Sequence, residues 1–380
     1  MPNYDYIIIG AGAVGLMLAD ALISDAFFLE KTILILDKDA KQNNDRTWCF
    51  WEKGEGVFDT ILYKTWPNIA FAGKELKLAK PITPYEYKML RGIDFYNHYL
   101  KKIKSNACIT FIQKKVTGLS DKEEFALVQT KDATYTAKKV FNSIFDYKSL
   151  LNQKKYPVLQ QHFLGWFVKT EEAVFNVNEA TFMDFSIPQK GNTRFMYVLP
   201  FTKTEALVEY TLFSESLLEK QAYETAIASY LKEKLGVTKY SIEAVEQGNI
   251  PMTCYDFSKN NSNSILNIGI AGGWAKPSTG YTFYNSTKKV KELVLHLKTN
   301  KQLSSFTKKT RFWYYDLLLL DILKQDNSLG QLIFESLFKR RKPQQILKFL
   351  DEDTNLWEDL QLIWACPKLP FIKALVKRIF

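Results

Sequence analysis

Residues 6–15 read Tyr6-Ile-Ile-Ile9-Gly10-Ala-Gly12-Ala-Val-Gly15, and this stretch decides the fold. Its apolar start predicts a β-strand, and the three glycines that follow have the spacing of a dinucleotide-binding turn. The first glycine permits the tight bend, and the second lets the backbone approach a pyrophosphate. The third lets the next helix pack closely on the strand. We therefore expect Gly10, Gly12 and Gly15 to bind the phosphates of a nucleotide.

The residues that follow complete a βαβ unit over residues 4–38. An amphipathic stretch to about Ser24 predicts a helix, and the apolar run Thr32–Leu36 predicts a second strand. Asp37 ends this strand, where a carboxylate can accept hydrogen bonds from ribose hydroxyls. The positive N-terminus of the helix would point at the phosphates.

A second glycine-rich turn follows the apolar stretch 265–270, which we expect to be a strand. It reads Asn267-Ile-Gly269-Ile-Ala271-Gly272-Gly-Trp274-Ala-Lys-Pro277-Ser-Thr-Gly280-Tyr-Thr-Phe283. Its spacing resembles the second FAD motif of aromatic-hydroxylase-like flavoproteins, with Gly269, Ala271, Pro277 and Gly280 in register. Ile270 occupies the position of the Asp that usually holds the ribityl chain. An ordinary strand-to-helix turn is the alternative, but the motif favours FAD over NAD.

Composition limits the classes of function. The net charge of +10 suits nucleic acid or an anionic membrane surface. We find no zinc-finger spacing and no other nucleic-acid motif, so a membrane surface is the favoured partner. Four scattered cysteines and three histidines predict no metal site, which leaves proton chemistry to carboxylates. No transmembrane stretch or signal peptide is recognised, so a peripheral location on the cytoplasmic side of the membrane is expected.

The pattern of elements predicts an α/β fold: a Rossmann-type FAD-binding domain, an inserted β-sheet substrate domain and a helical C-terminal region. Residues 1–150 and 250–300 are assigned to the discontinuous FAD-binding domain. Residues 151–249 are assigned to the β-rich domain, and residues 301–380 to the helical region. Within the first part, Pro84–Ser105 is expected to be helical because its apolar residues recur at helical spacing.

Two further stretches carry candidate chemistry. Asp45-Arg46-Thr47-Trp48-Cys49-Phe50-Trp51 places an acid and a base beside three aromatic residues in an expected loop. It could be a packed loop with an ion pair, or it could form the wall of an apolar pocket. The strand Ala206–Phe213 is apolar except for Glu209 and Thr211. Glu209 shares parity with Leu207 and Phe213, so it either faces solvent or is held in a pocket, where desolvation would raise its pKa.

Together these stretches resemble the bacterial, flavin-dependent lycopene β-cyclases. The resemblance covers about residues 1–290, and the segments at 44–51 and 271–283 are its most specific parts. It implies an isomerase that closes the ends of lycopene into β-ionone rings, giving γ-carotene and then β-carotene. It also implies a membrane-associated enzyme that needs reduced FAD, supplied with NADPH or NADH. Glu209 matches the first acid of the family's catalytic segment, whereas Tyr210 replaces the second acid.

Cyclisation requires an acid in a dry pocket, and Glu209 is the first candidate. Asp45, Glu52 and Asp184 are alternatives, with Asp45 also able to pair with Arg46. Ring faces of Trp48, Trp51 and Trp274, together with anionic reduced flavin, would stabilise the carbocation.

Two other functions remain open: an NADPH-dependent flavoprotein monooxygenase or prenyl reductase, and a non-catalytic carotenoid-binding protein. The basic, apolar segment Pro367–Phe380 is either an interfacial helix or a helix packed on the domain.

Overall fold

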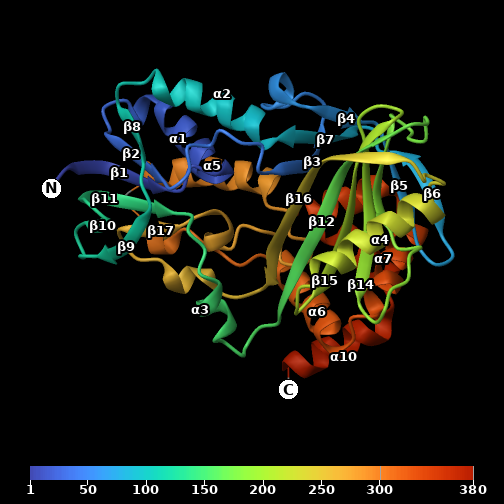
Figure 1. The fold of residues 1–380 in the computed structure, drawn as a ribbon. Helices are drawn as coiled ribbons and strands as arrows, with labels where there is room; N and C mark the ends of the chain where they lie inside the picture. The colour runs from blue at the N-terminus through green and yellow to red at the C-terminus, as the bar shows by residue number, and fades with distance from the viewer. Residues whose placement is uncertain (300, 380) are drawn as a thin grey trace.

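The computed structural model describes residues 1–299 and 301–379, and Asn300 and Phe380 lie outside the described residues. The chain forms two seven-stranded sheets, a three-stranded sheet and a helical C-terminal region (Figure 1). This arrangement confirms the predicted fold class.

The first sheet holds the βαβ unit and has the order β8-β2-β1-β11-β10-β9, with β17 paired to β11. Its central strands are parallel and covered on both faces, so they are continuous apolar runs. Helices α1, α2 and α5 lie together over one face (Figure 1). The bounds are β1 (Asn3–Ile9), β2 (Ile33–Asp37), β8 (Ile109–Gln113), β9 (Val116–Asp121), β10 (Ala126–Thr130), β11 (Thr134–Asn142), β17 (Ile265–Asn267), α1 (Ala13–Ile23), α2 (Gly92–Lys104) and α5 (Phe283–Leu297).

The second sheet has the order β16-β12-β15-β14-β13-β5-β6 and is covered on one face by α4. In β15, Val208, Tyr210 and Leu212 pack toward α4, while Leu207 and Phe213 contribute to the core on the other side. Glu209 shares the side of Leu207. The bounds are β5 (Asn68–Ala72), β6 (Lys77–Pro81), β12 (Val158–Thr170), β13 (Glu179–Asp184), β14 (Thr193–Pro200), β15 (Glu205–Ser214), β16 (Tyr240–Thr253) and α4 (Lys220–Glu233).

The third sheet, of order β3-β7-β4, joins the two larger ones, and the C-terminal helices pack against the face of the second sheet opposite α4 (Figure 1). The bounds are β3 (Thr47–Lys53), β4 (Lys64–Trp66), β7 (Tyr85–Arg91), α3 (Tyr147–Leu151), α6 (Arg311–Gln325), α7 (Leu329–Arg340), α8 (Pro343–Leu350), α9 (Leu356–Ala365) and α10 (Lys368–Ile379). Among the helices of the described ranges, none has the length and hydropathy that crossing a bilayer requires.

Three local expectations need correction. Pro84–Ser105 is not one helix, because β7 precedes α2: Tyr85, Tyr87 and Met89 alternate into the core as in a strand. The expected loop at residues 45–51 becomes strand β3 from Thr47. The strand expected over 265–270 ends at Asn267, and a 3₁₀ turn, Gly269–Gly272, follows it.

The sheets also cross the expected domain boundaries. Strands β5 and β6, from the part assigned to FAD binding, complete the second sheet. Strand β16 continues past residue 249 to Thr253. The part assigned to FAD binding therefore contributes strands to the second sheet, and the candidate site lies between these two interlinked parts.

Candidate active site

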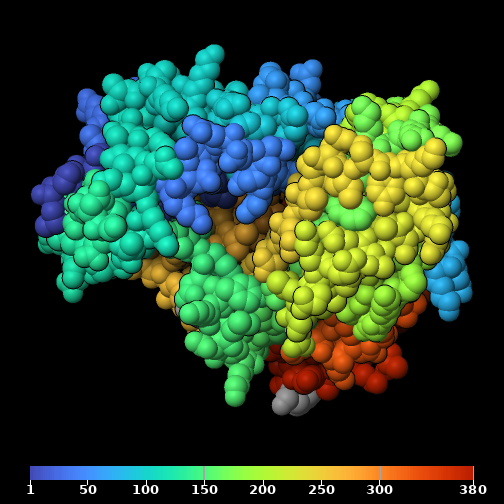
Figure 2. Space-filling model, viewed as in Figure 1, coloured from blue at the N-terminus to red at the C-terminus, as the bar shows by residue number. Residues whose placement is uncertain are grey.

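A cavity of about 610 Å³ lies between the glycine-rich turns and the second sheet. At one end it is lined by Gly12–Gly15 and by Gly269, Gly280 and their neighbours. At the other end it is lined by side chains of β12, β14, β15 and β16. The surface is hollowed between the blue segment near the N-terminus and the yellow segment that includes β16 (Figure 2). The glycine-rich turns and the candidate acids thus share one continuous space.

The first glycine-rich turn has the geometry that a dinucleotide needs. Gly10 has φ +99°, and a Cβ there would meet the Ser143 hydroxyl. A Cβ on Gly15 would meet the Gly10 carbonyl oxygen at 2.0 Å, so the helix packs closely on the strand. A Cβ on Gly12 would meet nothing within 4 Å, and Gly12 caps α1 without a side-chain hydrogen bond. The first turn of α1 therefore faces open space with free room for a phosphate.

The second turn lines the cavity opposite the first. Gly269 and Gly280 have positive φ angles of 61° and 71°. Ala271 and Gly272 are buried behind them, outside the lining, as is the partly buried Pro277. Among the described residues, Gln161 Oε1 and Thr279 Oγ1 are buried without a hydrogen-bond partner. Both side chains line the cavity, so polar groups there are placed to contact a bound cofactor.

Asp37 holds the first turn in place. One carboxylate oxygen accepts a hydrogen bond from the Ala11 N–H at 2.6 Å, and the other accepts from the Asp39 N–H. Asp37 is outside the cavity lining. Its contact with ribose hydroxyls stays a prediction.

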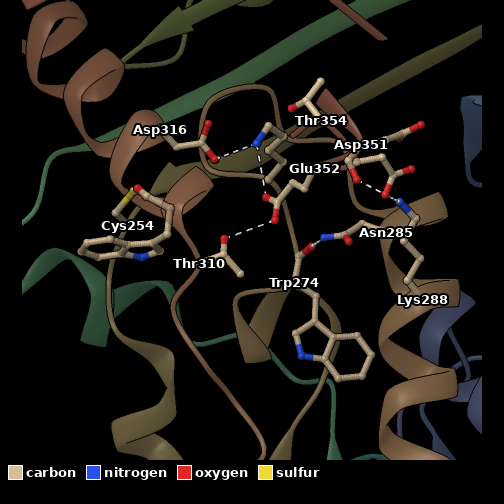
Figure 3. A network of polar contacts seen from close by, with 12 residues as sticks. Cys254, Trp274, Asn285, Lys288, Thr310, Asp316, Asp351, Glu352 and Thr354 are labelled. Carbon is tan, nitrogen blue, oxygen red and sulfur yellow. Dashed lines mark hydrogen bonds and ion pairs between the residues drawn. The ribbon is translucent and has the colours of Figure 1, made fainter. Parts of the chain in front are cut away.

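A buried ion-pair network fixes the second turn to the C-terminal helices (Figure 3). Lys276 Nζ donates to Asp316 at 3.0 Å and to Glu352 at 3.3 Å, and the side chains of Lys276 and Asp316 are 3% exposed. The Lys276 backbone accepts from Gly280 N–H and donates to the Tyr281 carbonyl. This network, Lys276–Asp316–Glu352, links α6 and the segment after α8 to the cavity wall.

Glu209 is buried and faces the cavity, which is the second of the two alternatives that the sequence left open. Thr211 Oγ1 donates to Glu209 Oε1 at 2.6 Å. Desolvation, followed by the nearby charge of Glu246, raises the Glu209 pKa to about 8. At neutral pH the carboxyl is protonated and can act as an acid.

Glu246, on β16, is a cavity residue that sequence reasoning missed. Most residues around it on β16 are exposed. Only the pairing of β16 with β12 shows that the Glu246 side chain is on the cavity side of the sheet. Thr47 Oγ1 donates to Glu246 Oε2 at 2.5 Å. Desolvation raises the Glu246 pKa to about 7, opposed by the Thr47 hydrogen bond and the positive charge of Arg46.

Aromatic residues form the rest of the inner wall. Tyr87 and Tyr197 hydrogen-bond to each other through their hydroxyls, and burial raises the pKa of both phenols, which therefore stay neutral. Their wall is completed by Phe163, Phe182, Phe195, Phe213, Tyr281, Phe283 and the Cys49 thiol. Such a wall suits an apolar ligand with few polar groups.

The other predicted site residues separate into two groups. Asp45, Arg46 and Trp48 line the cavity, but Asp45 and Arg46 are exposed, so the cavity opens to solvent there. Arg46 donates to the Asp45 backbone carbonyl, and Tyr96 donates to the Asp45 carboxylate. Trp48 stacks on Phe283 with ring centroids 5.0 Å apart.

Four predicted residues point elsewhere. Asp184 is buried on the α4 side of the sheet, where it accepts from the Tyr230 hydroxyl. Glu52 pairs with Lys88 at 3.1 Å. Trp51 lies behind the wall and donates to the Leu347 carbonyl, and Trp274 is buried in the first core and lines no part of this cavity. Within the described ranges no cluster of histidine, cysteine or acidic side chains could hold a metal ion.

Solved structures with a similar fold show the class of protein to which this chain belongs. A geranylgeranyl bacteriochlorophyll reductase-like protein from Thermoplasma acidophilum superposes with TM-score 0.66, 11% identity and 98% of each chain covered. The p-nitrophenol 4-monooxygenase of Pseudomonas putida DLL-E4 gives TM-score 0.62 at 12% identity, covering 98% of this chain and 99% of its own. A flavin-dependent brominase gives TM-score 0.58 at 14% identity, with 99% of each chain covered. The protein therefore has the aromatic-hydroxylase-like flavoprotein fold.

The sequence also identifies the protein family within this fold class. The sequence model described as Lycopene cyclase protein matches residues 5–376, so the chain belongs to the lycopene cyclase family. A lycopene beta-cyclase from Paracoccus sp. (strain N81106 / MBIC 01143) is 28% identical over 127 residues, which span 32% of this chain and 32% of that protein. The family predicted from residues 10–15, 44–51 and 268–283 is confirmed.

Proposed function

We propose that this protein is a lycopene β-cyclase that converts lycopene to γ-carotene and then to β-carotene by acid–base isomerisation. The observation that carries the proposal is the place of Glu209, a buried carboxyl with a pKa raised to about 8, in an aromatic cavity shared with the glycine-rich turns. A general acid for a weakly basic alkene needs such a water-poor setting.

Glu209 donates its proton to the terminal alkene of the substrate. Because Thr211 donates to Oε1, Oε2 is the oxygen free to carry that proton. Ring closure then gives a tertiary cation, which the ring faces of Trp48 and the cavity tyrosines stabilise. The glycine-rich turns would hold reduced FAD, which would supply negative charge without net electron transfer. NADPH or NADH is the proposed source of its electrons.

The direct test is expression in cells that accumulate lycopene. The expected result is a change from red to orange with β-carotene identified by chromatography. Purified enzyme should turn over without stoichiometric consumption of NADPH once its flavin is reduced. Unchanged lycopene in cells containing flavin-loaded protein would contradict the proposal, and stoichiometric NADPH use would favour a monooxygenase or prenyl reductase.

The pH dependence of cyclisation should show the titration of Glu209. Its acid form is the active one, and its pKa is raised to about 8 by desolvation. We therefore expect the rate to fall as pH rises through about 8, by about tenfold per pH unit beyond it. Initial rates of β-carotene formation between pH 6 and 10 measure this; a rate that stays flat to pH 10 would contradict it.

Flavin binding should depend on Gly12 in a way that separates cofactor contact from folding. The backbone of Gly12 has φ −77°, which alanine also adopts, and a Cβ there would meet no protein atom within 4 Å. Gly12→Ala should leave the stability of the apoprotein unchanged within about 0.5 kcal/mol. Its methyl group would occupy the space for the pyrophosphate, so the purified protein should contain less flavin by absorbance. Full flavin content would contradict this location of the cofactor.

We propose that exposed helix faces near the C-terminus contact the cytoplasmic membrane surface, from which the substrate enters. This α9–α10 apolar surface consists of Leu356, Trp357, Leu360, Ile363, Trp364, Leu369, Ile372, Leu375, Val376 and Ile379, which are 40–69% exposed. Lys368 lies over the Trp364 ring at 4.0 Å, and other lysines flank the surface. The opposite side of α10 is packed: Ala374 is buried and Arg378 pairs with Asp321 at 2.6 Å.

Replacing Trp357, Trp364 and Ile372 by serine should weaken binding to vesicles of mixed neutral and anionic phospholipids by at least about tenfold. The reason is the loss of apolar area that would be buried in the interface. Co-sedimentation measures this binding. The control replaces the exposed residues Phe27 and Leu29, which are distant in sequence from α9 and α10, by serine. Equal vesicle binding by the control variant and the α9–α10 variant would contradict the assignment.

A further inference from the structure

We propose that Glu246 is the second catalytic carboxylate of the cavity, the base that removes the ring proton from the cyclised cation. The inference deepens the proposed function and rests on it. The protonation of the alkene needs one carboxyl group, whereas completion of the ring double bond needs an acceptor for a proton released from another carbon. Glu246 comes from a strand that no sequence motif singled out.

The register of three neighbouring strands places the two carboxylates together. Gly165 on β12 pairs with Glu209 on β15 at one side and with Glu246 on β16 at the other. The two glutamates are therefore two strand spacings apart, with Cα atoms separated by about 9–10 Å. Both side chains line the same cavity.

Gly165 has no side chain, and the Leu207 and Glu209 side chains pack closely over its backbone. A Cβ built on Gly165 would lie 2.8 Å from Leu207 Cδ1 and 3.3 Å from Glu209 Cβ. The residue between the two acids thus contributes no side chain at their level. A substrate ring end can contact both carboxyl groups from one position, as an acid and a base acting on one small ring must allow.

The surroundings give the two groups different affinities for the proton. Desolvation raises the pKa of both, to about 8 for Glu209, which has a hydroxyl partner, and to about 7 for Glu246. Glu246 accepts a hydrogen bond from Thr47 and lies near the positive charge of Arg46. These two interactions stabilise the carboxylate form of Glu246. A pair of carboxyl groups with separated affinities for the proton supplies an acid and a base at the same pH.

The proton and the electrons balance without an oxidant. Glu209 gives a proton to the terminal alkene, and a second alkene attacks the resulting cation to form the ring C–C bond. A ring C–H bond then breaks: its electron pair becomes the ring double bond, and its proton goes to Glu246. Exposed Asp45 and Arg46 line the same cavity, so water there can carry the proton away and return one to Glu209.

The experiment compares Glu246→Gln with Glu209→Gln in lycopene-accumulating cells and as purified, flavin-loaded proteins. Glu246→Gln should lower β-ring formation by at least about 100-fold. Its residual product should shift to rings that lost a different proton or captured water, because the cation still forms. Glu209→Gln should lower the formation of all ring products together, because the cation itself forms more slowly. Glu243→Gln, an exposed acid on the same strand, should be unchanged.

The outcomes for the Glu246→Gln, Thr47→Val and wild-type proteins have distinct meanings. A flavin-loaded Glu246→Gln protein with the normal rate and product overturns it, as does one whose residual product is only the normal ring. If Glu246→Gln does not fold, Thr47→Val replaces it as the test, because it removes the hydrogen bond to the Glu246 carboxylate. That variant should lose about tenfold in rate with full flavin content, and an unchanged rate overturns the inference. Wild-type protein without any cyclic product contradicts the proposed function instead.

Discussion

Replacing Glu209 with Gln should lower the rate of cyclisation by about 10²- to 10⁴-fold, the usual contribution of a general acid. The amide keeps the shape of the side chain and can still accept the hydrogen bond from Thr211, but it has no acidic proton to give. The rate of β-carotene formation by purified protein with reduced flavin measures the loss. Flavin content should be unaffected, since Glu209 lies on the sheet side of the cavity rather than at the glycine-rich turns.

Glu205→Gln is the matched control. Glu205 begins the same strand and makes an ion pair with Lys169 at 3.4 Å, with both side chains substantially exposed. Loss of such a pair changes stability by at most about 1 kcal/mol and leaves the cavity intact. Normal turnover by flavin-loaded Glu209→Gln protein would show that the essential acid is elsewhere.

Replacing Lys276 with Met should lower the free energy of unfolding by about 3–5 kcal/mol. The change removes the cation of the Lys276–Asp316–Glu352 network and leaves Asp316 buried without its partner, 3.0 Å away in the native protein. Denaturant unfolding of the apoprotein measures the loss. Flavin affinity should fall as well, because the Lys276 backbone is hydrogen-bonded to Gly280 and Tyr281.

The control for this prediction is Lys289→Met, which removes an exposed i,i+3 pair with Glu292 and should cost less than about 1 kcal/mol. Adding Asp316→Leu to Lys276→Met should restore much of the lost stability, because no uncompensated charge is then buried. Equal denaturation midpoints for Lys276→Met and the native protein would show that the network contributes little.

Much of the fold could be predicted because it depends on local patterns. The turn at Gly10–Gly15 requires small residues at fixed spacing, and the parity of Glu209 followed from the two-residue period of a strand. The same reasoning failed at residues 84–105. There, Tyr85, Met89 and Ile93 lie at helical spacing, although strand β7 turns into helix α2 between them.

The missing parts of the site depend on contacts between distant segments. Glu246 lies in a strand with exposed neighbours, and only pairing with β12 brings it beside Glu209. Asp184 shows the reverse case: a bulge between Thr181 and Asp184 shifts the register of β13, and its carboxylate lies toward α4. Strand irregularities and partners of this kind have no single-sequence signal. Trp51 and Trp274 have the right residue type, but each is buried outside the cavity.

The Lys276–Asp316–Glu352 network also has a consequence for biosynthesis of the protein. The first glycine-rich turn is complete once the earliest strands have left the ribosome, but the second turn is held by carboxylates that are synthesised later, up to Glu352. Until that residue emerges, Lys276 has no complete set of partners. The nascent chain therefore completes the support of the second turn only after Glu352 has been synthesised, shortly before the helices with the exposed apolar faces follow.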